Sequence, residues 1–242
     1  TIASAVIKGD VAVAPAGLAT GELAIEAADL SDLGALALTE LSGSLKGDVA
    51  LSGEGDVQRV VINAKGADLA GAGARAGQLD VAATVIDPAG KIRLDGTASA
   101  AGLAYGDHAI DKLALIARGA PDGMDVTLDM SAQGSSASAA GRVVYGPAET
   151  KIDVARLDLA GGGKTGSLNA PAQFRLVGSE LFIDAFSLRT GEGGVLNVAG
   201  KAGGQLDLTV GLRALPLALG NACTPGLGLG GMLEGDARVT GL

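Results

Sequence analysis

Apolar and polar side chains alternate in short runs that recur along the whole chain. The run Asp125 to Met130 reads Asp-Val-Thr-Leu-Asp-Met, and similar alternation covers Lys91 to Asp95, Arg156 to Leu159 and Gln205 to Val210. A period of two places the apolar side chains on one face of a strand and the polar ones on the other. Turns rich in glycine separate these runs, so the pattern predicts roughly fifteen antiparallel strands.

The composition agrees with an all-β fold and argues against an ordinary globular core. The chain has 242 residues, of which 40 are glycine, and aromatic residues make up only 2%. Glycine at this frequency interrupts long helices, and a core without tryptophan and with few other aromatics gains little of the burial that rings usually supply. One segment, Ala24 to Leu41, also fits a helical spacing of its apolar residues, so we expect a short helix there as the exception.

One short motif recurs at three places in the chain. Ile7-Lys8-Gly9-Asp10-Val11-Ala12-Val13 returns as Leu45-Lys46-Gly47-Asp48-Val49-Ala50-Leu51, and more loosely from Leu233 to Val239. Such self-similarity indicates stacked units that touch mainly their neighbours. A β sequence of low diversity can also repeat itself by chance. We therefore predict that residues 1–242 form one elongated, repetitive β segment, and we expect it to be an excised part of a larger protein.

Charge and rare residues exclude several classes of function. The 18 basic and 27 acidic residues give a net charge of −9, and no basic run is present that would follow a phosphate backbone, so we expect no nucleic-acid partner. His108 is the only histidine and Cys223 the only cysteine. His108 is expected in a solvated turn, and the chain lacks the ligands of a zinc site. We expect no catalytic residue, no cofactor and no metal, and hence no enzyme.

Two further segments resemble functional motifs but do not fit them. The sequence Gly161-Gly162-Gly163-Lys164-Thr165 is like the end of a phosphate-binding loop. That loop needs a glycine at the position of Asp158 and a helix after it, whereas Pro171 follows shortly, so a loop between strands is predicted. The uncharged stretch Ala214 to Leu233 contains Pro216 and Pro225, and we reject it as a membrane-spanning helix.

The apolar face is what remains as a candidate site. A closed core would make this face purely structural, whereas a curved sheet with an open concave groove would leave it accessible to acyl chains or other apolar ligands. The residues predicted to line such a groove are the aliphatic members of the alternating runs: Leu79, Val81, Ile92, Leu94, Leu113, Leu115, Val126, Leu128, Leu157, Leu159, Leu196, Val198, Leu206, Leu208 and Val210.

The C-terminal quarter of the chain, 181–242, resembles a known repeat. Its order is a leucine strand, a glycine strand, an alternating strand, the triplet Leu-Pro-Leu and a strand that ends in Thr-Gly. The residues that carry this order are Asp184 to Leu188, Gly191, Leu196 to Gly200, Leu206 to Val210, Leu215 to Leu217 and Leu233 to Gly241. As a whole this order is similar to the TamB family, the inner-membrane-anchored components of the translocation and assembly module, which are related to the AsmA-like, bridge-like lipid transfer proteins. The rest of the chain shares with that family only the general pattern of alternating strands and glycine-rich turns.

The resemblance implies a β-taco fold that encloses a hydrophobic groove. It further implies a periplasmic protein anchored in the inner membrane of a Gram-negative bacterium. Such a protein conducts phospholipid between the inner and outer membranes or helps nascent outer-membrane strands to assemble, and it partners the outer-membrane barrel TamA. The alternative from another class is a structural β-solenoid, such as an adhesin-like surface stalk, with a closed apolar interior.

Overall fold

The computed structural model describes residues 5–15, 17–31, 40–106, 108–217 and 228–241. Within these ranges the chain is all-β: it contains sixteen strands and no α-helix. Contacts divide it into two compact units, Thr1–Ala120 and Pro121–Leu242. The all-β, antiparallel fold class predicted from the alternating runs is confirmed.

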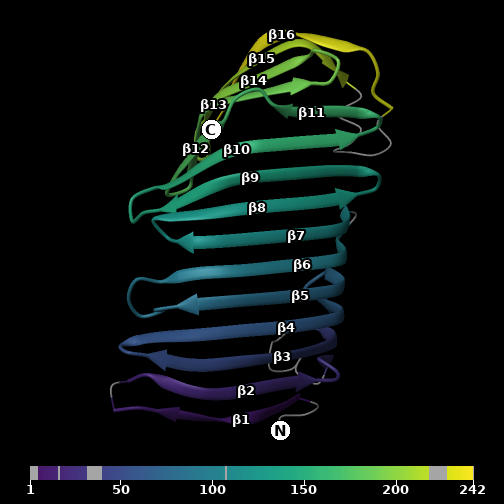
Figure 1. The fold of residues 1–242 in the computed structure, drawn as a ribbon. Helices are drawn as coiled ribbons and strands as arrows, with labels where there is room; N and C mark the ends of the chain where they lie inside the picture. The colour runs from purple at the N-terminus through teal and green to yellow at the C-terminus, as the bar shows by residue number, and fades with distance from the viewer. Residues whose placement is uncertain (1–4, 16, 32–39, 107, 218–227, 242) are drawn as a thin grey trace. The chain divides into compact units, whose positions relative to one another are not determined.

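The first unit is a meander in which each strand pairs antiparallel with the next along the chain. Figure 1 shows these strands in chain order from purple to blue-green. Their bounds are β1 (Ala5–Val13), β2 (Ala19–Ala27), β3 (Leu41–Glu54), β4 (Val57–Gly71), β5 (Ala74–Ile86), β6 (Arg93–Tyr105) and β7 (His108–Ala120). The hairpin turns between several of them use glycines with positive φ, such as Gly55 at +60° between β3 and β4.

The second unit is also an antiparallel meander, with one branch. Its strands are β8 (Gly123–Ala132), β9 (Ser135–Tyr145), β10 (Thr150–Gly161), β11 (Lys164–Leu168), β12 (Ala172–Val177), β13 (Glu180–Thr190), β14 (Val195–Ala202), β15 (Leu206–Pro216) and β16 (Met232–Gly241). β11 pairs with the last residues of β10 and β12 pairs with its first residues, and both then pair with β13. Two short strands therefore share one position in the sheet.

Neither unit has a core of the ordinary globular kind. Among the described residues, the buried apolar side chains are those of Ala27, Ala172 and Leu188, and none of the large side chains is fully buried. Most apolar side chains in the strands are instead half-buried. Stability must therefore come from strand pairing and from contacts between neighbouring side chains on one face of the sheet.

The prediction of a short helix from Ala24 to Leu41 is wrong at both ends of that segment. Ala24 to Ala27 are the last residues of β2, where Ala24 lies opposite Lys8 of β1 and Asp48 of β3, and Leu41 begins β3. The apolar positions from Leu23 to Ala27 fit a helical period of 3.6 as well as a strand period of two. Pairing with strands on both sides stabilises the β conformation. The middle of that segment, 32–39, lies outside the described residues.

Two smaller expectations concern turns. The glycine-rich segment at Gly161 is the tight hairpin between β10 and β11, with Gly162 and Gly163 at φ of +57° and +74°, as expected for a loop between strands. His108 is exposed, but it is the first residue of β7, opposite Tyr105 of β6, and so stands just beyond its predicted turn. Within the described ranges, no helix has the length and apolar character that a membrane span needs.

Candidate functional site: the aliphatic face

The registers of the first unit bring the predicted aliphatic residues onto one face, here called the aliphatic face. Leu45, Gly66, Leu79, Ala100 and Leu113 are successive cross-strand partners from β3 to β7. A second row of cross-strand partners lies two residues away from the first in each strand, and it consists of Gly47, Ala64, Val81, Ala98 and Leu115. Because positions two apart in a strand point to the same side, both rows share this face.

Leu94 joins the aliphatic face of the first unit through a third row. It lies opposite Val85 of β5, which lies opposite Val60 of β4 and then Leu51 of β3. Ile92 was predicted with Leu94, but β6 begins only at Arg93, so Ile92 precedes the strand and is 37% exposed. The alternation of Lys91 to Asp95 thus extends two residues beyond the strand itself.

A shallow hollow of about 430 Å³ crosses four strands of this unit. Each strand contributes one member of the second row to its lining: Ala64, Val81, Ala98 and Leu115. The other eight lining residues are the direct chain neighbours of these four, and their side chains point to the opposite face of the sheet: Asn63, Lys65, Asp80, Ala82, Thr97, Ser99, Ala114 and Ile116. Leu115 is 36% exposed, although it stands in the middle of β7. The hollow therefore does not by itself mark a binding site on the aliphatic face.

The second unit has an aliphatic face of its own. Val126, Leu128 and Met130 alternate along β8, and their partners on β9 are Gly141, Ala139 and Ala137. On β10, Leu157 and Leu159 lie opposite Ala139 and Ala137 and therefore share that face. All four of the predicted residues in β8 and β10 are thus brought together: Val126, Leu128, Leu157 and Leu159.

The face continues through the last strands of this unit. Leu159 lies opposite Gly166 of β11, which lies opposite Thr190 of β13. Leu188, two residues before Thr190, points to the same side and lies opposite Leu196 of β14. Val198 and Gly200 follow on β14, opposite Val210 and Leu208 of β15, whereas Leu206 is the next residue on that side of β15. The five predicted residues of β14 and β15 therefore lie on the same face as those of β8 and β10.

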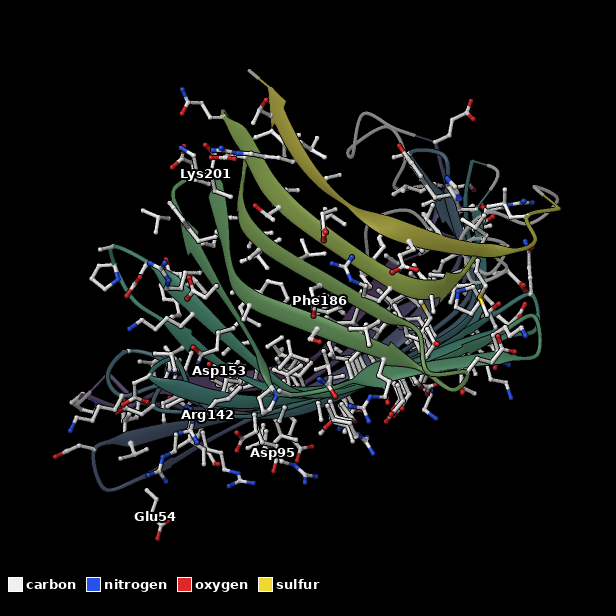
Figure 2. All side chains as sticks on the ribbon, turned by 90° about the horizontal axis from the view of Figure 1, so that it is seen from above. Glu54, Asp95, Arg142, Asp153, Phe186 and Lys201 are labelled. Carbon is white, nitrogen blue, oxygen red and sulfur yellow. The ribbon has the colours of Figure 1, made fainter. Side chains whose placement is uncertain are left out.

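Several residues of this face were missed by the sequence prediction. They include Phe174, Ile183 and Phe186, and the rings of Phe174 and Phe186 lie with their centroids 6.2 Å apart. A bulge between Ile183 and Phe186 changes the parity of β13. As a result Phe182 lies opposite Lys201 and Phe186 opposite Val198, although simple alternation would put both rings on one side. Figure 2 shows Phe186 and Arg142 on opposite sides of the sheet in this unit.

The opposite face of each unit carries the charges, here called the charged face. In the first unit, Lys46 contacts Glu26 at 2.7 Å and Arg118 contacts Asp95 at 3.0 Å. The hydrogen bond and the charge of Lys46 lower the pKa of the Glu26 carboxyl. These pairs join neighbouring strands in water, where each contributes little to stability alone.

In the second unit, arginines hold carboxylates in two-pronged contacts across strands. Arg175 donates to both oxygens of Asp184, at 3.0 and 2.9 Å, and its guanidinium lies 5.1 Å from the centre of the Phe182 ring. The hydrogen bond from Arg175 lowers the pKa of Asp184. Arg213 of β15 donates one hydrogen bond to Asp236 of β16, at 2.9 Å, and this bond lowers the pKa of Asp236.

The polar side chains of the described residues do not gather into a metal site. No group of three or more His, Cys, Asp or Glu side chains in the described ranges comes close enough to hold a metal ion. A second hollow, about 240 Å³, lies near Lys164, Thr190 and Glu192, but its lysine and glutamate already bind each other, and the Thr190 hydroxyl accepts the Gly194 N–H at 2.8 Å. Within the described residues, the aliphatic faces therefore remain the candidate site of both units.

Comparison with known proteins found no family model, no curated protein and no solved structure that matches this chain.

Proposed function

We propose that the chain is a segment of a periplasmic protein whose aliphatic faces form a groove that conducts phospholipid between the inner and outer membranes. A close variant of this function is the sheltering of nascent outer-membrane strands during their assembly. One observation carries the proposal: each unit presents rows of half-buried Leu, Val and Ala side chains on one face, and no described segment of the same unit covers them. The role is one of binding and guidance rather than of catalysis.

The physical case rests on the cost of moving acyl chains through water. Exposing one CH₂ group costs about 0.8 kcal/mol, whereas a chain that slides along a uniform aliphatic surface exposes little. The rows favour sliding because they alternate bulky with very small residues, as in Leu79, Ala100 and Leu113. Deep aromatic pockets would instead hold a ligand at fixed positions. Charges are kept on the other face, where carboxylates meet arginines and lysines.

The rival proposal is a structural stalk with a closed apolar interior. A closed solenoid would bury large aliphatic side chains as thoroughly as a globular core does. Leu188, at 6% exposure, is the largest apolar side chain that is buried among the described residues. This pattern supports an open face rather than a closed one. The inner-membrane anchor, the periplasmic location and the contact with TamA belong to the proposal through the resemblance of residues 181–242 to the TamB repeat.

The experiment introduces one charge into the aliphatic face of the parent protein. Leu128→Arg places an unpaired ion on a path that every lipid must cross, at a cost of several kcal/mol. Asp129→Arg is the matched control, because the side chain of residue 129 lies on the charged face of the same strand. We expect Leu128→Arg to abolish, and Asp129→Arg to retain, complementation of an outer-membrane permeability defect at equal protein level and protease resistance. Full complementation by a folded, abundant Leu128→Arg protein would overturn the proposal.

A further inference from the structure

A single lysine stands at the end of the aliphatic face of the second unit. Lys164 is the first residue of β11 and lies opposite Gly161 of β10, on the side where Leu159 and Gly166 also lie. The other charged residues in the described strands of this unit are placed on the charged face by their register or by a bulge. Lys164 therefore brings a cation to a face that is otherwise apolar.

An anion meets this lysine from the turn between β13 and β14. Glu192 of that turn forms an ion pair with Lys164, and the two side chains are 43% and 31% exposed, so both charges can be reached from water. They line the hollow of about 240 Å³ together with Thr165, Thr190 and Pro216 and with glycines of the two turns. A positive and a negative group therefore lie side by side in a hollow at the edge of the aliphatic face.

Thr190 connects this hollow to the apolar side chains of the face. It is 3% exposed and stands two residues after Leu188, which is 6% exposed and points to the same side. The Thr190 hydroxyl accepts the N–H of Gly194 at 2.8 Å, which fixes its oxygen, and a hydroxyl that accepts one hydrogen bond can still donate another. The hollow thus combines a cation, an anion and a buried hydroxyl beside an aliphatic surface.

We propose that this hollow binds the headgroup of a phospholipid that carries both a phosphate and a primary ammonium group, such as phosphatidylethanolamine. The inference rests on the proposed function, because the acyl chains of the same lipid lie on the aliphatic face next to Leu188. Lys164 and the Thr190 hydroxyl donate to the phosphate, and Glu192 accepts from the ammonium group. One ion pair within the protein is exchanged for two with the ligand.

The charges of the hollow select this class of headgroup over others. A headgroup with a phosphate but no ammonium group, as in phosphatidylglycerol, takes Lys164 from Glu192 and leaves that carboxylate beside a like charge. A quaternary ammonium group has no N–H to donate to Glu192. Inorganic phosphate offers neither an ammonium group nor an acyl chain. Glu192 is therefore the residue that determines specificity, and Lys164 is the residue that holds the phosphate.

The test is a competition between two phospholipids with identical acyl chains. The 242-residue chain is mixed with equal amounts of phosphatidylethanolamine and phosphatidylglycerol in detergent, and native mass spectrometry measures how much of each stays bound. We expect the wild-type chain to prefer phosphatidylethanolamine by roughly threefold or more. Glu192→Gln should remove this preference, and Lys164→Gln should lower the bound amount of both lipids. Glu149→Gln is the matched control, because Glu149 pairs with Lys151 outside the hollow, and should keep the wild-type ratio.

The outcomes separate this inference from the function on which it rests. Circular dichroism establishes that each variant keeps its β structure, and the wild-type ratio tests the inference without any variant. Equal binding of the two lipids by the wild-type chain, or a wild-type ratio in folded Glu192→Gln, would overturn the headgroup site and leave lipid binding by the aliphatic face in place. A wild-type chain that binds neither phospholipid would overturn both.

Discussion

Arg238 reaches from β16 to Asp207 of β15 and donates two hydrogen bonds to its carboxylate, at 2.8 and 2.9 Å. The pair lies on the charged face, because Asp207 stands between Leu206 and Leu208, whose side chains point to the aliphatic face. It joins the last strand of the second unit to its neighbour. The hydrogen bond from Arg238, aided by its charge and that of Lys201, lowers the pKa of Asp207.

Replacing Arg238 by glutamine should raise the pKa of Asp207 toward its ordinary value. The two-pronged hydrogen bond stabilises the ionised carboxylate, and glutamine cannot supply the same charge. Carboxyl chemical shifts followed through a pH titration measure this directly. Asp184, which Arg175 binds in the same way, serves as the internal control and should keep its lowered pKa. An unchanged titration of Asp207 in the variant would contradict the pairing.

Stability should fall as the solution is acidified. Glu26, Asp184, Asp207 and Asp236 all have pKa values lowered by a bound lysine or arginine. A carboxyl whose pKa is lower in the folded state contributes stability above its unfolded pKa of about 4, and that contribution is lost as the pH falls through the folded value.

Urea unfolding at neutral pH and at successively lower pH measures this loss. Because the pairs are exposed, added salt should reduce the difference between neutral and acidic pH. Equal midpoints at neutral and acidic pH in low salt would show that these pairs do not hold the strands together.

Replacing Gly200 by alanine should destabilise the second unit. Gly200 has a φ of +128°, and an added Cβ would collide with the backbone carbonyl oxygen of Asp207 on the paired strand. Such strain costs on the order of 1–3 kcal/mol. Gly204→Ala is the matched control, because nothing lies within 4 Å of its added Cβ. Thermal unfolding of both variants should show a lower midpoint for Gly200→Ala alone; equal midpoints would place the two strands further apart than described.

Alternation in the sequence was sufficient to predict the strands and most of the aliphatic face. Regular stretches such as Val126 to Met130 contain no bulge, so a period of two carries directly into space. Alternation stops being a guide where a bulge changes that period. Val154 and Arg156 are two residues apart, yet a bulge puts them on opposite faces, with partners Gly141 and Ala140. Nothing in the local pattern of apolar residues marks such a bulge, since it depends on the register with the neighbouring strand.

The structure also changes which control best tests the aliphatic face. Asp129 and Asp207 both lie on the charged face, where arginine is tolerated as long as no ion pair is lost. Asp207 is bound by Arg238, and Asp207→Arg would set two guanidinium groups against each other. Asp129 accepts a hydrogen bond from the hydroxyl of Ser138 on the neighbouring strand and forms no ion pair with any described residue. We therefore expect Asp129→Arg to unfold at nearly the wild-type temperature and Asp207→Arg to unfold at a lower one, as measured by circular dichroism.

Native mass spectrometry of the purified chain tests the central claim most directly, by asking whether phospholipid stays bound to its aliphatic faces. We predict that wild-type chain and Asp129→Arg carry co-purified phospholipid, and that Leu128→Arg and Leu208→Arg, on the aliphatic face, lose most of it while remaining folded. Wild-type chain without any bound phospholipid, or equal amounts of phospholipid on Leu128→Arg and Asp129→Arg, would contradict the account.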